Sequence, residues 1–209
     1  MTDVDFKIFN SIAVFGGTFD PVHYGHLVAA NEVMHAFSTD GVIFIPAGMP
    51  SHKDSSCVTD NELRLEMTKI ATSSNPRFFV SRMEIERGGP SYTIDTVSEL
   101  KRLLKPNAKI YFVVGADSIF QVFSWKDARR LITMCEFIGV TRPGYNKGEL
   151  YERIKNINQN CESNIHFCEI PSLDISSSEI RERVKEGKSI KYLVPEGVEE
   201  YIYKKGLYR

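Results

Sequence analysis

Two histidines three residues apart, His23 and His26, follow a pair of glycines early in the chain. An imidazole can donate a hydrogen bond to an anion, and a bound polyphosphate would favour the protonated form of both rings. Gly16 and Gly17 allow main-chain N–H groups to approach a ligand closely, and Pro21 stiffens the turn. The chemistry that this stretch could perform is therefore the binding of a phosphate chain.

The stretch lies between an expected strand and an expected helix. The apolar run at 12–15 is typical of a buried strand, and apolar residues recur at helical spacing after the histidines. These residues are Leu27, Ala30, Met34 and Phe37. The N terminus of a helix presents unpaired N–H groups and the positive end of its dipole, which stabilise an anion. The sequence has neither the Gly-Lys-Ser/Thr ending of a P-loop nor the G-x-G-x-x-G pattern of dinucleotide-binding folds.

Short apolar runs alternate with helical patterns along the chain. Strands are expected at 12–15, 42–45, 78–80, 110–114, 137–140 and 165–170. Helices are expected between and after them, with apolar stripes over 63–71, 94–103 and 150–157 and with capping boxes at Thr59–Glu62 and Ser176–Glu179. This alternation predicts an α/β fold with a doubly wound, mostly parallel sheet, whose ligands lie at the carboxyl ends of the strands near the topological switch point.

The composition is that of one globular domain covering residues 1–209. The chain has 42% hydrophobic and 25% charged residues and a formal net charge of -1, so no global positive field would attract nucleic acid or an anionic membrane. The first ten residues have no signal-peptide core, and no apolar run approaches membrane-spanning length. We expect a cytoplasmic protein whose four cysteines, which form no C-x-x-C pair, are reduced.

Cys161, His166 and Cys168 are close enough in the sequence to suggest a metal site. The alternative is a strand over 165–170, which would place His166 and Cys168 on one face as ordinary side chains. The second interpretation is favoured, so no metal site built from protein ligands is expected.

A second candidate anion site begins at Ser176. Ser176, Ser177 and Ser178 place hydroxyl groups at the N terminus of an expected helix, and Arg181 can reach back toward the same end. Taken alone, Ser176 and Glu179 could simply cap the helix while Arg181 stays in solvent. Together with the first motif, two helix N termini could hold one polyphosphate.

These two segments resemble the signature elements of a known family. Gly16–His26 resembles the G-x-F-D-P-x-H-x-G-H motif of the adenylyltransferase branch of the nucleotidylyltransferase superfamily. Asp174–Arg181 is similar to the I-S-S-T-x-I-R element of the bacterial nicotinate mononucleotide adenylyltransferases, with Ser178 where that family often has threonine. The resemblance extends from Gly16 to Arg183 and implies the Rossmann-like nucleotidylyltransferase fold.

Other segments resemble further elements of that family. Gly48–Lys53 is similar to its G-x-P-P-H-K loop, with Ser51 in place of the second proline, and 90–96 is similar to its P-S-Y-T-x-D-T segment. The resemblance implies that ATP is bound by Gly16, Gly17, Thr18, Phe19, His23, His26, Gly115, Asp117, Ser176, Ser177, Ser178 and Arg181. It implies that the mononucleotide is bound by His52, Lys53, Ser91, Tyr92, Thr93, Trp125 and Arg142.

Several of these roles come from the resemblance alone. In the family, the lysine that Lys53 matches binds phosphate, and the P-S-Y-T segment binds the pyridine carboxylate through main-chain amides. The tryptophan that Trp125 matches stacks on the pyridine ring. The aspartate of the family's G-A-D motif, which Asp117 matches, lies near the nucleotide sugar. The arginine of its R-P-G motif, which Arg142 matches, can bind the mononucleotide phosphate. By spacing alone, 90–96 is only a helix start, Trp125 is more typical of a core residue, and Arg142 belongs to a turn in solvent.

The reaction that the resemblance implies is transfer of an adenylyl group from ATP to nicotinate mononucleotide, which yields nicotinate adenine dinucleotide and pyrophosphate. The attacking phosphate is already an anion, so positioning and charge neutralisation can carry the catalysis without a side-chain base. His23, His26 and Arg181 would hold the ATP phosphates as the catalytic residues. Mg²⁺ would be held mainly by the phosphates and would keep much of its water.

Other interpretations stay open at this point. The acceptor could be nicotinamide mononucleotide or phosphopantetheine, although phosphopantetheine adenylyltransferases usually carry T-x-G-H and are shorter. Class I aminoacyl-tRNA synthetases share an H-x-G-H motif, but this chain has no room for tRNA-binding domains. A non-catalytic nucleotide sensor is a further alternative, and the oligomeric state, a homo-oligomer included, is not determined by the sequence.

Overall fold

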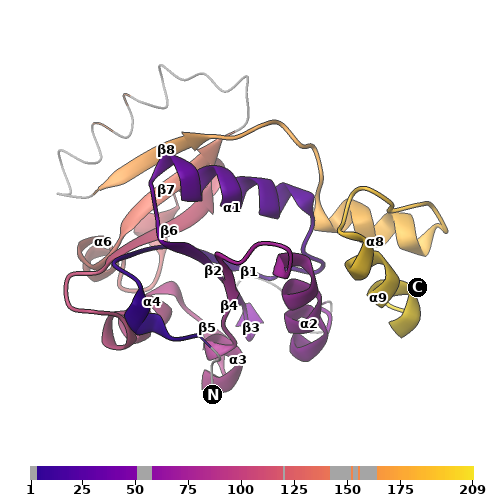
Figure 1. Cartoon of the computed structure of the whole chain (residues 1–209), viewed down its shortest axis with the longest axis horizontal. Helices are drawn as coiled ribbons and strands as arrows, with labels where there is room; N and C mark the ends of the chain where they lie inside the picture. The colour runs from indigo at the N-terminus through magenta and orange to yellow at the C-terminus, as the bar shows by residue number, and fades with distance from the viewer. Residues whose placement is uncertain (1–3, 51–57, 120, 142–151, 153–154, 156–163) are drawn as a thin grey trace.

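A parallel sheet of six strands forms the centre of the protein in a computed structural model, which describes residues 4–50, 58–119, 121–141, 152, 155 and 164–209 (Figure 1). The strands lie in the order β4-β2-β1-β6-β7-β8. Their bounds are β1 Ser11–Gly17, β2 Gly41–Pro46, β4 Phe78–Val80, β6 Lys109–Gly115, β7 Glu136–Thr141 and β8 Ile165–Glu169. Every neighbouring pair in this sheet is parallel, so the predicted doubly wound α/β fold is confirmed.

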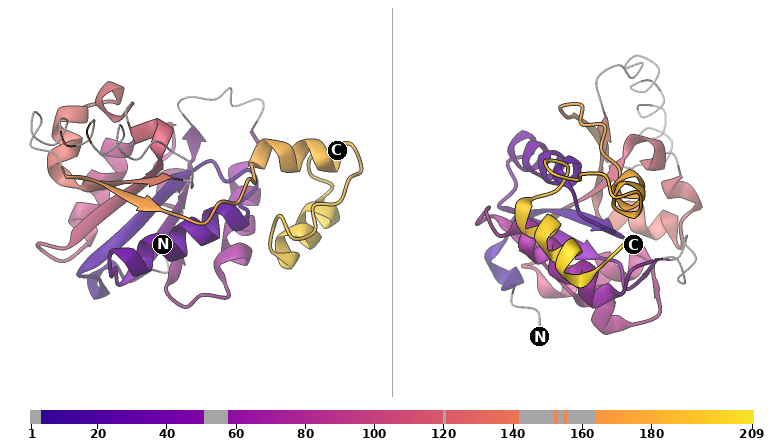
Figure 2. Two further views of the ribbon diagram at one scale, coloured as in Figure 1. Left: turned by 90° about the horizontal axis from the view of Figure 1, so that it is seen from above. Right: turned by 90° about the vertical axis from the view of Figure 1, so that its right-hand side faces the viewer.

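Helices pack on both faces of the sheet. Their bounds are η1 Phe6–Ile8, α1 Tyr24–Ala36, α2 Asn61–Thr72, α3 Met83–Arg87, α4 Thr93–Leu103, α5 Ala116–Ile119, η3 Val122–Ser124, α6 Ala128–Met134, α8 Ser177–Lys185 and α9 Glu196–Lys205. One core joins the sheet to α1, α2, α8 and α9, and the other joins it to α4 and α6. Figure 2 shows α8 and α9 together at one end of the molecule. No helix among the described residues is long and apolar enough to cross a membrane.

Alternation along the strands explains the two cores. Successive side chains of a strand point to opposite faces, so Phe15 of β1 belongs to the first core and Val14 to the second. In β2, Val42 to Ile45 are all fully buried, because helices cover the sheet on both sides. This burial is the physical reason for the continuous apolar runs in the sequence.

A second, two-stranded sheet joins two loops. β3 (Met49–Pro50) pairs in parallel with β5 (Pro90–Ser91), so that Pro50 lies opposite Ser91. The main-chain N–H of Gly48 also donates to Ser91 Oγ at 3.1 Å. The loop after β2 is thereby attached to the segment that opens α4.

Some local expectations were wrong. The N-cap of α2 is Asp60, whose side chain accepts from the N–H of Glu62, whereas the N–H of Thr59 donates to Asp20 Oδ2 at 3.2 Å. The capping box predicted at Thr59 is therefore absent. Leu103, at the end of the stripe predicted for α4, is 37% exposed, whereas Leu104, four residues after Leu100, is buried, because three-residue steps drift off one face of a helix with 3.6 residues per turn. The helical stripe expected over 150–157 lies largely outside the described residues.

The chain order of the strands places the switch point between β1 and β6. From β1 the chain continues to β2 and β4 on one side, and β6 is followed by β7 and β8 on the other. The crossover connections leave β1 and β6 in opposite directions, so a crevice opens at their carboxyl ends, next to Gly17 and Gly115. A ligand of this sheet is expected in that crevice.

Candidate active site

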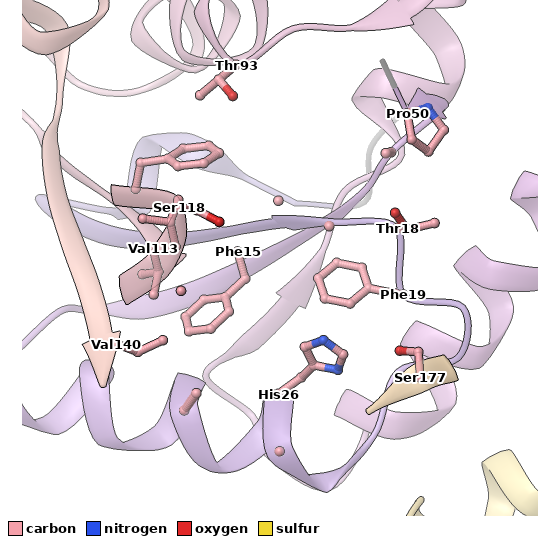
Figure 3. Close-up of a pocket in the computed structure, with 18 of the residues that line it drawn as sticks. Phe15, Thr18, Phe19, His26, Pro50, Thr93, Val113, Ser118, Val140 and Ser177 are labelled. Atoms are coloured by element: carbon pink, nitrogen blue, oxygen red, sulfur yellow. The ribbon is translucent and has the colours of Figure 1, made fainter. Parts of the chain in front are cut away.

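A cleft of about 1110 Å³ opens at the carboxyl ends of β1 and β6 (Figure 3). One wall is the loop after β1 with the start of α1, and another is the segment that leads from β8 into α8. The other side is formed by Pro50 of β3, by Ser91 to Thr93 and by the region around Trp125. Segments from Phe15 to Ser178, far apart in the sequence, therefore converge on one site.

The two histidines lie side by side at the start of α1. Buried His23 is the N-cap residue, and partly buried His26 follows in the first helical turn. Their ring centroids are 3.8 Å apart, and the main-chain N–H of His23 donates to Nδ1 of His26 at 3.3 Å. Because Nδ1 is the acceptor, the neutral His26 ring carries its proton on Nε2, which can donate to a ligand.

Loss of hydration in the cleft lowers the pKa of His26 well below its ordinary value, and the neighbouring His23 lowers it further. His26 is therefore neutral near pH 7 unless an anion stabilises its charged form. The Phe19 ring packs edge-on against the imidazole, with 5.1 Å between the centroids. A side chain at Gly17 would meet this ring, since a Cβ there would lie 3.0 Å from Phe19 Cζ.

The N terminus of α8 is fastened to the loop that precedes α1. Ser177 Oγ donates to the carbonyl oxygen of Pro21 at 2.8 Å, and Arg181 Nη1 donates to that of Asp20 at 2.7 Å. Ser176 caps α8 by accepting from the N–H of Glu179 at 3.1 Å, which confirms the serine half of the predicted capping box, whereas the carboxylate of Glu179 accepts from Arg183 Nε at 3.0 Å. The structure thus brings the two proposed anion-binding helix ends together (Figure 3).

Asp20, in the loop before α1, is hydrogen-bonded to two distant segments of the chain. Its buried carboxylate accepts from the hydroxyl of Tyr208 at 2.7 Å and from the N–H of Thr59 at 3.2 Å. Burial, together with the negative charge of Asp20, raises the pKa of the Tyr208 hydroxyl. The neutral hydroxyl is therefore a stable donor, and the C-terminal end of the chain is tied to the loop that carries the histidines.

Trp125 is both a core contact and a cleft wall. Its indole packs edge-on against Phe112 and Phe137, with centroid distances of 6.4 and 6.2 Å. The same partly buried side chain also lines the cleft. The sequence interpretations of Trp125 as core and as ligand contact are thus compatible.

Most of the residues singled out from the sequence line the cleft. They are Gly16, Gly17, Thr18, Phe19, His23, His26, Ser91, Tyr92, Thr93, Gly115, Trp125, Ser176, Ser177 and Ser178. Arg181 does not line it, because its guanidinium is bonded to Asp20 and, at 3.3 Å, to cleft-lining Ser178. Asp117 lies in α5, directly after β6. His52, Lys53 and Arg142 lie outside the described residues.

The cleft also contains charged residues that the sequence did not single out. Glu84 of α3 is 6% exposed and accepts from Thr96 Oγ1 at 2.5 Å, and burial raises the pKa of its carboxyl. Lys126 lies 4.3 Å above the centroid of the Tyr92 ring. Its position directly after the tryptophan was a signal that could have indicated it. Glu84 had none, because its place in the cleft depends on how α3 packs.

The strand interpretation of His166 and Cys168 is confirmed, because both belong to β8 and lie on the same face of the sheet, against the core that contains α1. His166 Nε2 lies 2.7 Å from Glu136 Oε2, and buried Cys168 belongs to the core on the α1 side of the sheet. Cys161 lies outside the described residues. Within the part of the chain that the structure describes, no three His, Cys, Asp or Glu side chains form a group that could hold a metal ion.

Comparison with known proteins identifies similar chains. The sequence profile of the cytidylyltransferase-like family matches residues 14–183. A Moorella thermoacetica protein named "Probable nicotinate-nucleotide adenylyltransferase" is 50% identical over 198 residues, which cover 95% of this chain and 91% of that protein. A protein of the same name from a Thermoanaerobacter species is 47% identical over 198 residues, covering 95% of this chain and 94% of its own.

The fold also matches a solved structure. It is described as "Plasmodium falciparum nicotinic acid mononucleotide adenylyltransferase complexed with NaAD", and the TM-score is 0.76. The alignment covers 95% of this chain and 97% of that chain at 23% sequence identity. At this identity the likeness concerns the fold.

The lowered pKa of His26 predicts how folding stability depends on pH. An unfolded histidine binds a proton below about pH 6.5, whereas the folded His26 does not until the pH is lower. The contribution of His26 to stability is therefore present above about pH 6.5 and is lost as the pH falls through the lowered folded pKa. We expect His26→Asn to reduce the loss of unfolding free energy between about pH 7 and pH 5, measured by urea titration.

The matched control is His35→Asn, which removes an exposed histidine from the same helix. An identical pH dependence in wild type and His26→Asn would contradict the prediction.

Proposed function

The chain belongs to the cytidylyltransferase-like family and, within it, to the nicotinate-nucleotide adenylyltransferases, and we propose how its cleft carries out their reaction. The activity is transfer of the adenylyl group of ATP to nicotinate mononucleotide, which forms nicotinate adenine dinucleotide and pyrophosphate in NAD biosynthesis. The observation that carries the assignment of residues is the meeting of two helix N termini above a pair of histidines.

We place the ATP phosphates between the N termini of α1 and α8. Both ends offer main-chain N–H groups and positive dipole ends, and Ser176 and Ser178 add hydroxyls at the cleft surface. His23 and His26 contact the phosphates from α1. Arg181, through its neighbour Ser178, adds a positive charge beside the same phosphates.

The rest of the ATP molecule lies along the carboxyl ends of the central strands. Gly16 and Gly17 end β1, Thr18 and Phe19 follow it, and Gly115 ends β6 on the other side of the switch point. Asp117, in α5, follows at the position where the family has the aspartate near the nucleotide sugar. These residues are the proposed nucleoside side of the ATP site.

We place nicotinate mononucleotide on the opposite side of the cleft. Residues 91–93 line the cleft where β5 leads into the N terminus of α4, and their main-chain N–H groups are proposed to bind the pyridine carboxylate. The indole of Trp125 provides an apolar surface for the ring. His52, Lys53 and Arg142 are proposed to bind the mononucleotide on the basis of sequence alone.

This arrangement suits a reaction that needs no general base. The 5′-phosphate of the mononucleotide is an anion and attacks the α-phosphorus in line, while the bond to the pyrophosphate breaks and its electron pair leaves with the pyrophosphate. Catalysis then depends on holding the two phosphates in contact and on stabilising the charge that develops on the leaving group. Helix ends, imidazole N–H groups and a guanidinium provide that stabilisation.

Mg²⁺ is the expected companion of ATP. The groups placed at the triphosphate are N–H and O–H donors, which fit phosphate oxygens rather than a cation. We therefore propose that the ion is held by the phosphates and by water, and that it neutralises phosphate charge when bound. The assignment of residues 1–209 to one domain, a cytoplasmic location and the formation of a homo-oligomer stay predictions.

Pyrophosphate release from ATP tests this function. The chain should release pyrophosphate with nicotinate mononucleotide at a kcat/KM well above that with nicotinamide mononucleotide or phosphopantetheine, assayed in parallel. Equal rates with all three acceptors would contradict the assigned mononucleotide site. Binding of ATP without turnover on any acceptor would instead support a nucleotide sensor.

His26→Ala should lower kcat on the order of 10²- to 10³-fold at saturating ATP, because it removes a donor to the leaving phosphates. Steady-state kinetics measure this change, and the melting temperature shows whether folding is affected. His35→Ala, an exposed histidine at the end of the same helix, is the control and should keep kcat. A near-normal kcat in His26→Ala would reject the catalytic role.

Trp125→Ala should raise the KM for nicotinate mononucleotide about 10-fold, since stacking of a ring on an aromatic side chain contributes roughly 1–3 kcal/mol. The KM for ATP should change far less. Trp125→Phe keeps an aromatic surface, so its KM for nicotinate mononucleotide should lie between that of the wild type and that of Trp125→Ala. Equal increases in both KM values would make Trp125 a packing residue only.

A further inference from the structure

A buried arginine lies beneath the cleft, outside the roles assigned so far. Arg64 of α2 is only 1% exposed. Its guanidinium donates three hydrogen bonds of 2.7 Å, from Nε to the carbonyl oxygen of Thr59, from Nη1 to that of Thr18 and from Nη2 to that of Ala47. A longer contact of 3.5 Å joins Nη2 to the carbonyl oxygen of Gly48. One planar group therefore holds three separate segments.

Two of these segments are the neighbouring loops after β1 and β2, which the last ladder bond, from the N–H of Ala47 to the carbonyl oxygen of Gly17 at 2.8 Å, joins directly, and from there they lead to different parts of the proposed active site. Thr18 belongs to the loop after β1, on which we place ATP, and it lines the cleft. Ala47 also lines the cleft and follows β2, where the chain turns toward Pro50 and the mononucleotide side. Beyond this ladder bond, the guanidinium with its donors in a fixed plane holds the carbonyl groups of Thr18 and Ala47 relative to each other more rigidly than a flexible ammonium could.

Within the described part of the chain, the buried positive charge of Arg64 is bonded to main-chain carbonyl groups rather than to a carboxylate. Its hydrogen-bond acceptors among the described residues are main-chain carbonyl oxygens, and the carboxylates of Asp20 and Asp60 act on it only from a greater distance. Burying a charge without a directly bonded partner of opposite sign is costly. Folding stability alone is therefore a weak reason for an arginine at this position of α2.

We propose that Arg64 is a positioning residue that sets the distance between the ATP-binding loop and the mononucleotide side of the cleft. This inference rests on the proposed placement of the two substrates. In-line attack requires the reacting atoms to be about 3–3.5 Å apart, and a misplacement of about 1 Å can cost on the order of 10²-fold in rate. Each substrate keeps its own contacts when Arg64 is changed, so kcat should fall while the separate affinities stay nearly constant.

Two substitutions separate spacing from charge. Arg64→Lys keeps a buried positive charge but cannot bond Thr18, Ala47 and Thr59 together in one plane. Arg64→Met keeps an unbranched side chain and removes both charge and donors. Thr72→Val is the matched control, since Thr72 is also buried in α2 and, among the described residues, its hydroxyl bonds to carbonyl oxygens within that helix alone.

The measurements are kcat, the KM of each substrate, and calorimetric titrations with ATP alone and with nicotinate mononucleotide alone. The titrations give both dissociation constants and the fraction of chains that can bind, so kcat can be expressed per binding-competent site. We expect Arg64→Lys and Arg64→Met to lose on the order of 10²-fold in this kcat, with dissociation constants within about threefold of wild type. Thr72→Val should resemble wild type in both respects.

Three results would overturn the proposal. The first is a kcat per competent site in Arg64→Lys within about threefold of wild type, which would show that charge is sufficient. The second is that both Arg64 variants bind the two substrates so much more weakly that weaker binding accounts for the whole rate loss. The third is that Thr72→Val loses as much kcat per competent site as the Arg64 variants do. Failure of the proposed function would be distinct, because the wild-type chain itself would then release no pyrophosphate with nicotinate mononucleotide.

Discussion

The junction of two helix N termini is the constraint on which the rest of this site depends. Both ends are positive, so their dipoles oppose close approach in the absence of an anion. Hydrogen bonds from Ser177 and Arg181 to the carbonyl groups of Pro21 and Asp20 nevertheless hold α8 against the loop before α1. The arrangement favours any ligand that brings negative charge between the helices, and a triphosphate chain does so.

The buried polar groups under the cleft support this junction from below. Tyr208 and Thr59 donate to the carboxylate of Asp20, and Arg64 donates to carbonyl groups of the two loops that flank the site. Buried polar groups that are satisfied in this way make the surrounding backbone rigid. Such rigidity suits a reaction in which geometry and charge, rather than proton transfer, lower the barrier.

Local patterns predicted the strands and most helices because hydrophobic spacing and capping depend on residues close in sequence. The buried runs of β2 and β6 and the Ser176 cap were of this kind. Predictions failed where a distant group intervened. Thr59 was expected to cap α2, but its N–H donates to Asp20 in another loop, and Asp60 caps the helix instead. No local pattern indicated α3, whose Glu84 lies in the cleft.

By itself, the sequence determined the fold class and the order of the six strands of the main sheet, and it predicted a phosphate ligand from glycines, histidines and serines at helix starts. Only the tertiary structure decided which groups meet. Ser177 lies 156 residues from Pro21, and Tyr208 lies 188 residues from Asp20, yet each pair is joined by a hydrogen bond. Such pairs depend on how the sheet and its crossovers bring distant segments together, and spacing along the chain carries no information about them.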